Sequence, residues 1–242
     1  MAVSDVTIPV RGGVPAYLAT PDGEGPWPGV VVIHDIFGVT PDLRRQVEWL
    51  ASEGFVAVAP AFFHDQGKVR CMISIFRGAR ERKGAVYGDI EATRDWLKAR
   101  DDSTDKAGII GFCMGGGLAL LSAPDGGFDA SSVNYGSTGD WFYSPEVLRG
   151  ACPVVGSFGG KDKGLKGSAA KLDKALTEAD VPHDVKEYPD AGHGFLNNHG
   201  AEGKMPPMMA VMQKVAGAGW HEDSASDARQ RIIGFFGEHL KQ

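Results

Sequence analysis

Short runs of apolar and β-branched residues recur along the chain, and segments with helical periodicity separate most of them. Runs of about four to eight such residues, bounded by turn-forming residues, are typical of strands buried in a sheet. We predict strands over residues 30–33, 55–59, 107–112, 132–135, 153–158 and 184–188.

The segments between these strands place apolar residues three and four positions apart, which puts them on one face of a helix. Strands separated by helices are parallel and joined by right-handed crossovers, so that both faces of the sheet are covered. We therefore predict a doubly wound α/β sheet. The four apolar faces consist of Leu43, Val47, Leu50 and Ala51; Val86, Ile90, Thr93 and Leu97; Ala169, Leu172 and Leu176; and Ala228, Ile232, Phe235 and Phe236.

Two segments depart from this alternation. Residues 6–10 and 14–18 flank Arg11-Gly12-Gly13, whose glycines suit the positive φ angles of a hairpin turn, so an antiparallel hairpin is predicted at the start. Residues 197–223 form an irregular stretch with four methionines at helical spacing. This stretch is either a cap over a pocket or a packed surface helix.

Composition narrows the class of protein. A chain of 242 residues with 43% hydrophobic and 23% charged residues can form one α/β domain. The net charge of −6 opposes binding to nucleic acids or anionic membranes, and residues 1–13 lack the apolar run of a signal peptide. We expect a cytoplasmic protein with free thiols at three widely spaced cysteines, no metal site and no cofactor.

One motif at the end of a predicted strand carries candidate chemistry. Residues 107–112 run into Gly111-Phe112-Cys113-Met114-Gly115, which opens a helical segment. This arrangement has the form of a nucleophile elbow, the sharp strand-to-helix turn of many hydrolases, with cysteine as the nucleophile. Small residues are needed because a Cβ atom at either glycine would crowd the turn. The N–H of Met114 is then a candidate oxyanion donor. The alternative is that Cys113 is a small buried apolar residue and not a nucleophile.

A thiol nucleophile needs a base, and the base needs an orienting acid. His193 follows the predicted strand 184–188 and Asp162 follows 153–158, so both lie at the carboxyl edge of the sheet. The order Cys, Asp, His is that of hydrolases with this topology. Asp173, Asp180 and Asp190 compete with Asp162 but lie on or after a helix, or close to the histidine in sequence.

The predicted strand 30–33 leads into His34-Asp35-Ile36-Phe37-Gly38, where such folds place the second oxyanion donor. Ile36 N–H is the candidate. Asp35 is expected to point a carboxylate toward Cys113, which disfavours a thiolate and keeps the resting thiol neutral. His34 is interpreted as a structural residue at the end of the strand.

These motifs, together with Ala191-Gly192-His193-Gly194-Phe195, resemble the dienelactone hydrolase family across nearly the whole chain. The resemblance implies an α/β-hydrolase fold, with Cys113 as nucleophile, His193 as base and Asp162 as orienting acid. It also implies Ile36 and Met114 as oxyanion donors, and a role for Asp35 in activating the cysteine. Family members usually carry glutamate at the position of Asp35.

The resemblance also bears on the substrate. Family members that cleave dienelactone hold its carboxylate with two arginines, and the first of these positions is Asn197 here. Arg70, Arg77 and Arg80 lie near the second without a clear match. We expect Phe37, Phe195, Asn197 and Arg70 to contact the substrate.

The resulting hypothesis is a hydrolase that cleaves a small ester or lactone through a Cys113 thioester and acts as a monomer or small homo-oligomer. Two alternatives stay open. One is an inactive or redox-sensing scaffold, for which an ordered His and Asp would be unnecessary. The other is the same fold acting on amides or thioesters.

Overall fold

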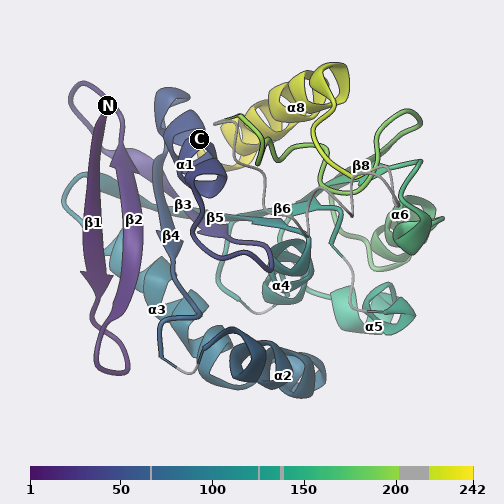
Figure 1. The fold of residues 1–242 in the computed structure, drawn as a ribbon, viewed down its shortest axis with the longest axis horizontal. Helices are drawn as coiled ribbons and strands as arrows, with labels where there is room; N and C mark the ends of the chain where they lie inside the picture. Colours follow the sequence, from purple (N-terminus) through teal and green to yellow (C-terminus); the bar gives the residue numbers. More distant parts are fainter. Residues whose placement is uncertain (66, 125, 137–138, 202–217, 242) are drawn as a thin grey trace.

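The computed structural model describes residues 1–65, 67–124, 126–136, 139–201 and 218–241. Its centre is an eight-stranded sheet with the order β1-β2-β4-β3-β5-β6-β7-β8 (Figure 1). The strands are β1 (Ala2–Ile8), β2 (Val14–Thr20), β3 (Trp27–Ile33), β4 (Val56–Pro60), β5 (Ser103–Phe112), β6 (Ala130–Asn134), β7 (Val154–Gly159) and β8 (His183–Tyr188).

The strands from β3 to β8 are parallel to one another, whereas β2 pairs antiparallel with both β1 and β4. The predicted doubly wound sheet and its antiparallel start are therefore confirmed. Because the carboxyl ends of parallel strands share one edge, the loops that follow β3, β5, β6, β7 and β8 converge there.

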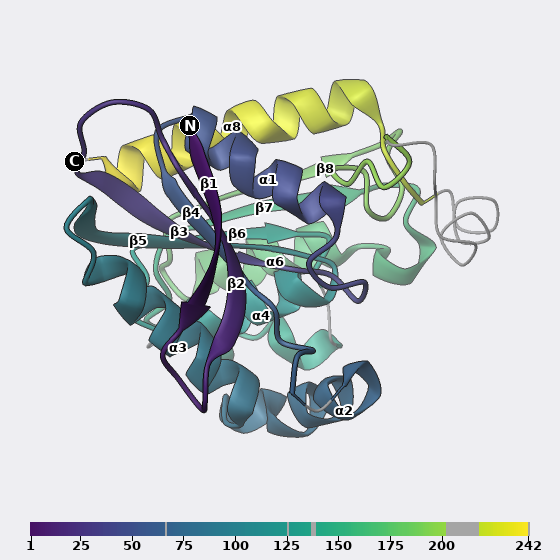
Figure 2. The same ribbon diagram turned by 60° about the vertical axis from the view of Figure 1, so that its left-hand side comes forward.

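Helices cover both faces of the sheet (Figure 2). On one face, α1 (Pro41–Ser52) and α8 (Glu222–Leu240) bury their apolar residues in one core cluster. On the other, α3 (Ala85–Lys98), α4 (Met114–Ser122) and α6 (Ser168–Glu178) pack in a second cluster. The predicted apolar faces are buried as expected, except that Phe235 is half-buried at the margin of the first cluster.

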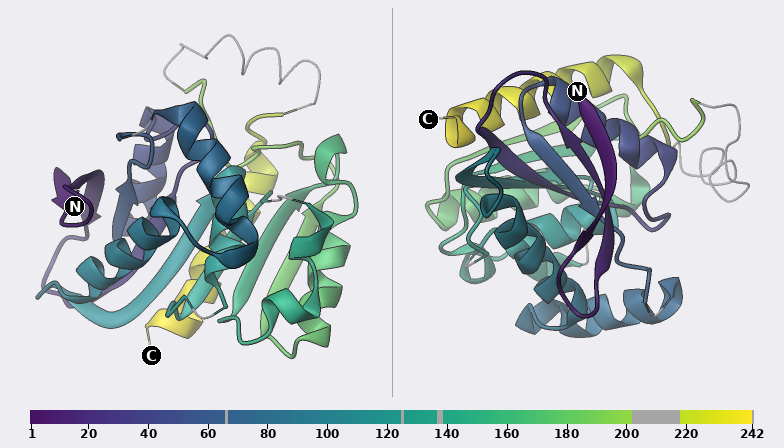
Figure 3. Two further views of the ribbon diagram at one scale, coloured as in Figure 1. Left: turned by 90° about the horizontal axis from the view of Figure 1, so that it is seen from below. Right: turned by 90° about the vertical axis from the view of Figure 1, so that its left-hand side faces the viewer.

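Several boundaries differ from the prediction. The hairpin at the outer edge of the sheet (Figure 3) pairs Ile8 with Val14, so Val10 belongs to its turn and not to a strand. Cys71 lies in a helix, α2 (Lys68–Gly78), where the sequence analysis identified no element. The shorter helical elements are η1 (Ala79–Glu81), η2 (Asp140–Phe142), α5 (Pro145–Leu148) and η3 (Lys163–Leu165).

The irregular stretch predicted over residues 197–223 ends where α8 begins, at Glu222. Its four methionines, Met205, Met208, Met209 and Met212, lie outside the described residues. The alternatives of a cap and a packed helix therefore stay open.

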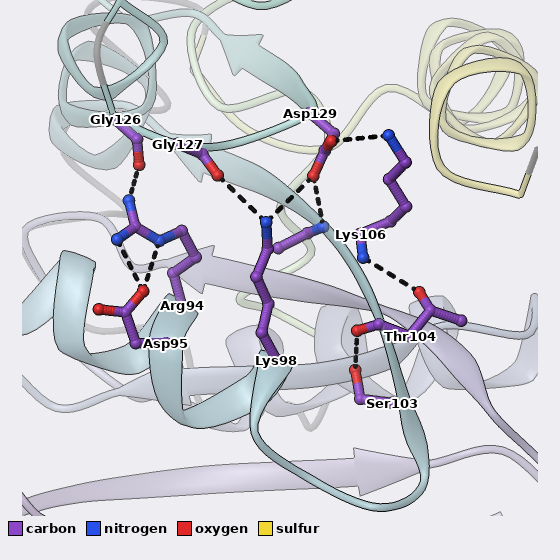
Figure 4. A network of polar contacts seen from close by, with 10 residues as sticks. Arg94, Asp95, Lys98, Ser103, Thr104, Lys106, Gly126, Gly127 and Asp129 are labelled. Atoms are coloured by element: carbon purple, nitrogen blue, oxygen red, sulfur yellow. Dashed lines mark hydrogen bonds and ion pairs between the residues drawn. The ribbon is translucent and has the colours of Figure 1, made fainter.

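A polar network at the amino end of the parallel strands ties β5 to β6 (Figure 4). The carboxylate of Asp129, just before β6, accepts the N–H of Ala107 at 2.9 Å and pairs with Lys106 at 3.0 Å and Lys98 at 3.4 Å. Burial alone would raise the pKa of Asp129, but these hydrogen bonds and charges outweigh it and lower the pKa. The network fixes the start of β5, the strand that ends beside Cys113.

We expect Asp129→Asn to lower the free energy of unfolding by about 1–2 kcal/mol at neutral pH, because a charged hydrogen-bond acceptor is lost. A carboxylate whose folded pKa is lowered stabilises the protein above its unfolded pKa, and this stabilisation is lost as pH falls through the folded pKa. The difference between wild type and variant in urea unfolding should therefore shrink below about pH 4.

The exposed Asp105 on the same strand provides the matched control, and Asp105→Asn should change stability little. An equal effect of both substitutions at every pH would contradict the importance of the Asp129 network.

Candidate active site

Five adjacent parallel strands each deliver a functional side chain to the carboxyl edge of the sheet. Their spatial order is β3, β5, β6, β7 and β8, so the loops that follow them are neighbours. This edge is where open α/β sheets bind their ligands. The residues that follow these strands are Asp35, Cys113, Tyr135, Asp162 and His193, respectively.

The turn from β5 into α4 holds Cys113 in an unusual backbone conformation, with φ 54° and ψ −116°. A Cβ atom at Gly111 would lie 1.9 Å from the carbonyl oxygen of Gly115, and one at Gly115 would lie 2.4 Å from that of Ile33. Both positions therefore require glycine, as the motif indicated. Met114 begins α4 directly after the cysteine, so its N–H lies in the first helical turn, where N–H groups lack intrahelical acceptors.

His193 contacts Asp162 across neighbouring loops. The distance from His193 Nδ1 to Asp162 Oδ2 is 2.5 Å, and Asp162 Oδ1 accepts the N–H of Gly164 at 2.9 Å. Asp162 is only 5% exposed, so its carboxylate is held in one place. The two loops are joined by a backbone hydrogen bond of 2.9 Å from Lys161 N–H to Ala191 O.

The imidazole of His193 is poised as a cation beside the cysteine. Burial lowers its pKa, but hydrogen bonds to Asp162 and Cys113 and their negative charges outweigh burial and raise the pKa to about 10. A neutral resting thiol on Cys113 stays a prediction.

Asp35 lies in the same pocket as Cys113, but its carboxylate has other partners. Oδ1 accepts the N–H of Phe37 at 2.7 Å, and Oδ2 lies 3.1 Å from Nε2 of His199. No role was predicted for His199 from the sequence. Its position six residues after His193, in the same loop, was the only signal that could have indicated it. A direct action of Asp35 on the thiol stays a prediction.

Tyr135 is a second residue that sequence analysis missed. It follows β6 with φ 40°, its side chain is buried, and its ring centroid lies 5.2 Å from that of His193 in an edge contact. Its hydroxyl donates a hydrogen bond to the side-chain oxygen of Asn197. An aromatic residue at the end of a predicted strand on this edge was the available signal.

Asn197 occupies the first of the two positions where family members that cleave dienelactone carry an arginine. Its side-chain amide forms hydrogen bonds to other residues of the protein. Besides accepting from Tyr135, it donates from Nδ2 to Asp42 Oδ2 at 2.6 Å, and it is only 4% exposed. Asp42 in turn accepts the N–H of Asn198 at 2.8 Å. Asn197 therefore links α1 to the loop that carries His193.

The other residues expected to bind substrate lie in different places. Phe37 and Ile36 line the pocket that holds Cys113 and His193. Phe195 is fully buried, with its ring centroid 5.0 Å from that of Tyr188, and is not among the described residues that line the pocket. Arg70 is exposed on α2 and is not among the described residues that line the pocket.

Comparison with known proteins identifies the family. Residues 14–240 match the family model described as the dienelactone hydrolase family. The chain belongs to this family. Like its relatives, it is a dienelactone hydrolase-like hydrolase with the α/β-hydrolase fold.

The relatives of this dienelactone hydrolase family member span nearly its full length. It is 29% identical over 253 residues to the "Putative carboxymethylenebutenolidase" of Yersinia pestis, covering 97% of this chain and 88% of that protein. Among solved structures, the "Putative Dienelactone Hydrolase" of Klebsiella pneumoniae is 26% identical with a TM-score of 0.75, and 98% of each chain is covered. A dienelactone hydrolase-like promiscuous phosphotriesterase from metagenomic libraries also has a TM-score of 0.75, and the comparison covers 99% of this chain and 98% of that one. Its sequence identity is 19%, so this likeness shows the fold alone.

A larger hollow of about 510 Å³ lies elsewhere, between α1 and α8. It is lined by Trp49, Trp220 and Arg229, whose guanidinium lies 5.1 Å and 5.2 Å from the two indole rings. Cys113 and His193 are not among its lining residues, so the candidate active site is chosen by its chemistry and not by cavity size.

In the part of the chain that the structure describes, no group of three or more His, Cys, Asp or Glu side chains could hold a metal ion. No helix within it is long and apolar enough to cross a membrane. His34 is fully buried and accepts the N–H of Phe62 on Nε2 at 3.3 Å, which agrees with the structural role predicted for it.

Gly115→Ala should disrupt the turn, because the added methyl group would collide with backbone atoms of β3 that cannot move aside cheaply. We expect ester hydrolysis to fall more than tenfold and the free energy of unfolding to fall by about 1–3 kcal/mol. Enzyme kinetics and urea unfolding measure the two effects.

The matched control is Gly237→Ala in α8, where an added Cβ has no neighbour within 4 Å. This substitution should leave activity unchanged and stabilise the helix slightly. Wild-type activity in Gly115→Ala would contradict the steric argument.

Proposed function

We propose that this protein hydrolyses a small ester or lactone through a thioester on Cys113, with His193 as general base and acid and Asp162 as its orienting partner. The observation that carries the proposal is the position of His193, which hydrogen-bonds Asp162 through Nδ1 and lines the same pocket as Cys113. A nucleophile, a base and an orienting acid gathered in this way are the parts that covalent acyl transfer requires.

In the first half of the reaction, the Cys113 thiolate attacks the carbonyl carbon and forms a C–S bond. The carbonyl oxygen becomes an oxyanion, which in this proposal the N–H groups of Ile36 and Met114 stabilise. Such donors contribute most when they are fixed before the reaction begins. Collapse of the tetrahedral intermediate breaks the C–O bond, and the leaving alkoxide takes the proton from protonated His193.

In the second half, neutral His193 accepts a proton from water, and the hydroxide attacks the thioester carbonyl. The same two N–H groups stabilise the second oxyanion. Collapse breaks the C–S bond, releases the carboxylic acid, which loses its proton to solvent, and restores the thiolate beside protonated His193. With a lactone, the alcohol and the carboxylate stay in one molecule.

The names of the relatives support a lactone or ester carbonyl as the target. Amides and thioesters are chemically accessible to the same machinery, but no described contact favours them. An inactive sensor would need only the thiol. The buried Asp162, held by Gly164 N–H and directed at His193, supports catalysis over sensing.

Cys113→Ala should reduce the kcat of p-nitrophenyl acetate hydrolysis by several orders of magnitude, because the covalent route is lost. Burial raises the pKa of Cys71 and raises that of Cys152 to about 12, so neither thiol is suited to act as a nucleophile. Cys71→Ala and Cys152→Ala are therefore the matched controls and should keep their activity. Near-normal turnover by Cys113→Ala would end the proposal.

Dienelactone should be a poor substrate compared with its own uncharged methyl ester. Asn197 cannot form the bidentate, charged hydrogen bonds of an arginine, and a substrate carboxylate loses about 1.5–3 kcal/mol, or roughly ten- to a hundredfold in affinity, without them. Measuring kcat/KM for lactone cleavage in both compounds tests this expectation. A strong preference for the free acid would show that another cation replaces the missing arginine.

A further inference from the structure

His199 forms an ion pair that reaches from the loop after His193 to the loop after β3. Its Nε2 lies 3.1 Å from Asp35 Oδ2, and the two side chains are only 6% and 9% exposed. The edge of the His199 ring also contacts Phe37, with centroids 5.5 Å apart. A pair this buried is held in one geometry by its surroundings.

The Asp35 end of this pair shapes a tight turn. Asp35 Oδ1 accepts the N–H of Phe37 at 2.7 Å, and its backbone carbonyl accepts the N–H of Gly38 at 3.3 Å. Ile36 lies between these two contacts, and its N–H is the oxyanion donor on this side of the pocket. The direction of that N–H follows the Asp35–Ile36 peptide plane, so movement of the aspartate turns the donor.

The surrounding charges favour the protonated form of His199. Burial lowers its pKa, but Asp35, through a hydrogen bond and its charge, and Asp42 on α1 outweigh burial and Arg45, so the pKa is raised. On other elements packed nearby, Lys68 of α2 lies 5.1 Å from the Phe37 ring. Cys113 and His193 line the same pocket. An imidazolium is the stronger partner for a carboxylate than a neutral ring.

We propose that His199 is a positioning residue, which holds the Asp35 turn so that Ile36 N–H points at the developing oxyanion. The inference rests on the proposed thioester reaction, because an oxyanion forms twice in it. His199 itself touches neither the nucleophile nor the reacting carbonyl in this role. Its contribution is made in the transition state and not in substrate binding.

Three variants test the proposal with p-nitrophenyl acetate as substrate. His199→Ala removes the ion pair, and His199→Gln keeps an N–H donor of similar reach without the charge. His183→Ala is the matched control, since His183 pairs with Asp173 at 3.4 Å but begins β8, at the opposite end of the sheet from the site.

We expect His199→Ala to lower kcat by about ten- to a hundredfold with KM changed less than about threefold, because only transition-state stabilisation is lost. His199→Gln should recover to within about fivefold of wild type. His183→Ala should match wild type.

Inhibition by a trifluoromethyl ketone separates positioning from loss of folded protein. The thiolate adds to the carbonyl carbon of such a ketone, and the adduct carries a stable oxyanion that resembles the transition state. The Ki of the ketone in His199→Ala should therefore rise by the same factor as kcat/KM falls. A smaller fraction of folded enzyme would lower the apparent kcat but leave Ki unchanged.

Several results would overturn the inference. They are a kcat within about twofold of wild type in His199→Ala, an unchanged Ki despite slow turnover, or a glutamine variant as slow as the alanine variant. Failure of the thioester reaction itself is distinguished by Cys113→Ala. If Cys113→Ala retains turnover, the proposed thioester reaction is wrong. If Cys113→Ala is inactive and His199→Ala is unaffected, only the role proposed for His199 is wrong.

Discussion

The active site depends on how closely the start of α4 approaches the backbone of its neighbouring strands. Gly115 lies against the carbonyl oxygen of Ile33, and Gly111 lies against that of Gly115, so no side chain separates helix from sheet. This contact directs the amino end of α4 into the pocket and leaves Cys113 at positive φ. Strain of this kind costs on the order of 1–3 kcal/mol. Hydrogen bonds from Cys113 N–H to Asn134 at 3.1 Å and from Gly117 N–H to Cys113 at 3.2 Å hold the turn in place.

The residues with a local signature were predictable from sequence. Cys113 carries glycines at fixed offsets, and His193 and Asp162 follow recognisable strands, so their meeting at one edge follows from the parallel topology. His199 and Tyr135 carry no such signature. The partner of His199 is 164 positions away, at Asp35, and the choice of that partner depends on packing between loops that periodicity cannot describe.

The missed helix α2 shows a different limit. Cys71 and Ile75 face the core, but Val69, Ile73 and Phe76 on the same helix are exposed by 71%, 45% and 53%. Apolar residues on both faces erase the contrast that periodicity detects. By contrast, the apolar faces predicted for α1 and α3 are among the buried residues of these helices, and those predictions are confirmed.

The three cysteines have unequal environments, and this has a practical consequence. Cys71 is buried in α2, and Cys152, although partly exposed, is surrounded by protein that raises its thiol pKa to about 12. Cys113 is partly exposed and lines a pocket together with His193. Electrophilic probes react with thiolates, which burial disfavours at Cys71 and Cys152, so a fluorescent maleimide or an isotope-coded alkylating reagent should mark Cys113 first in the unmodified chain. Cys113 can thus be counted by stoichiometric labelling, without first engineering a cysteine-free background.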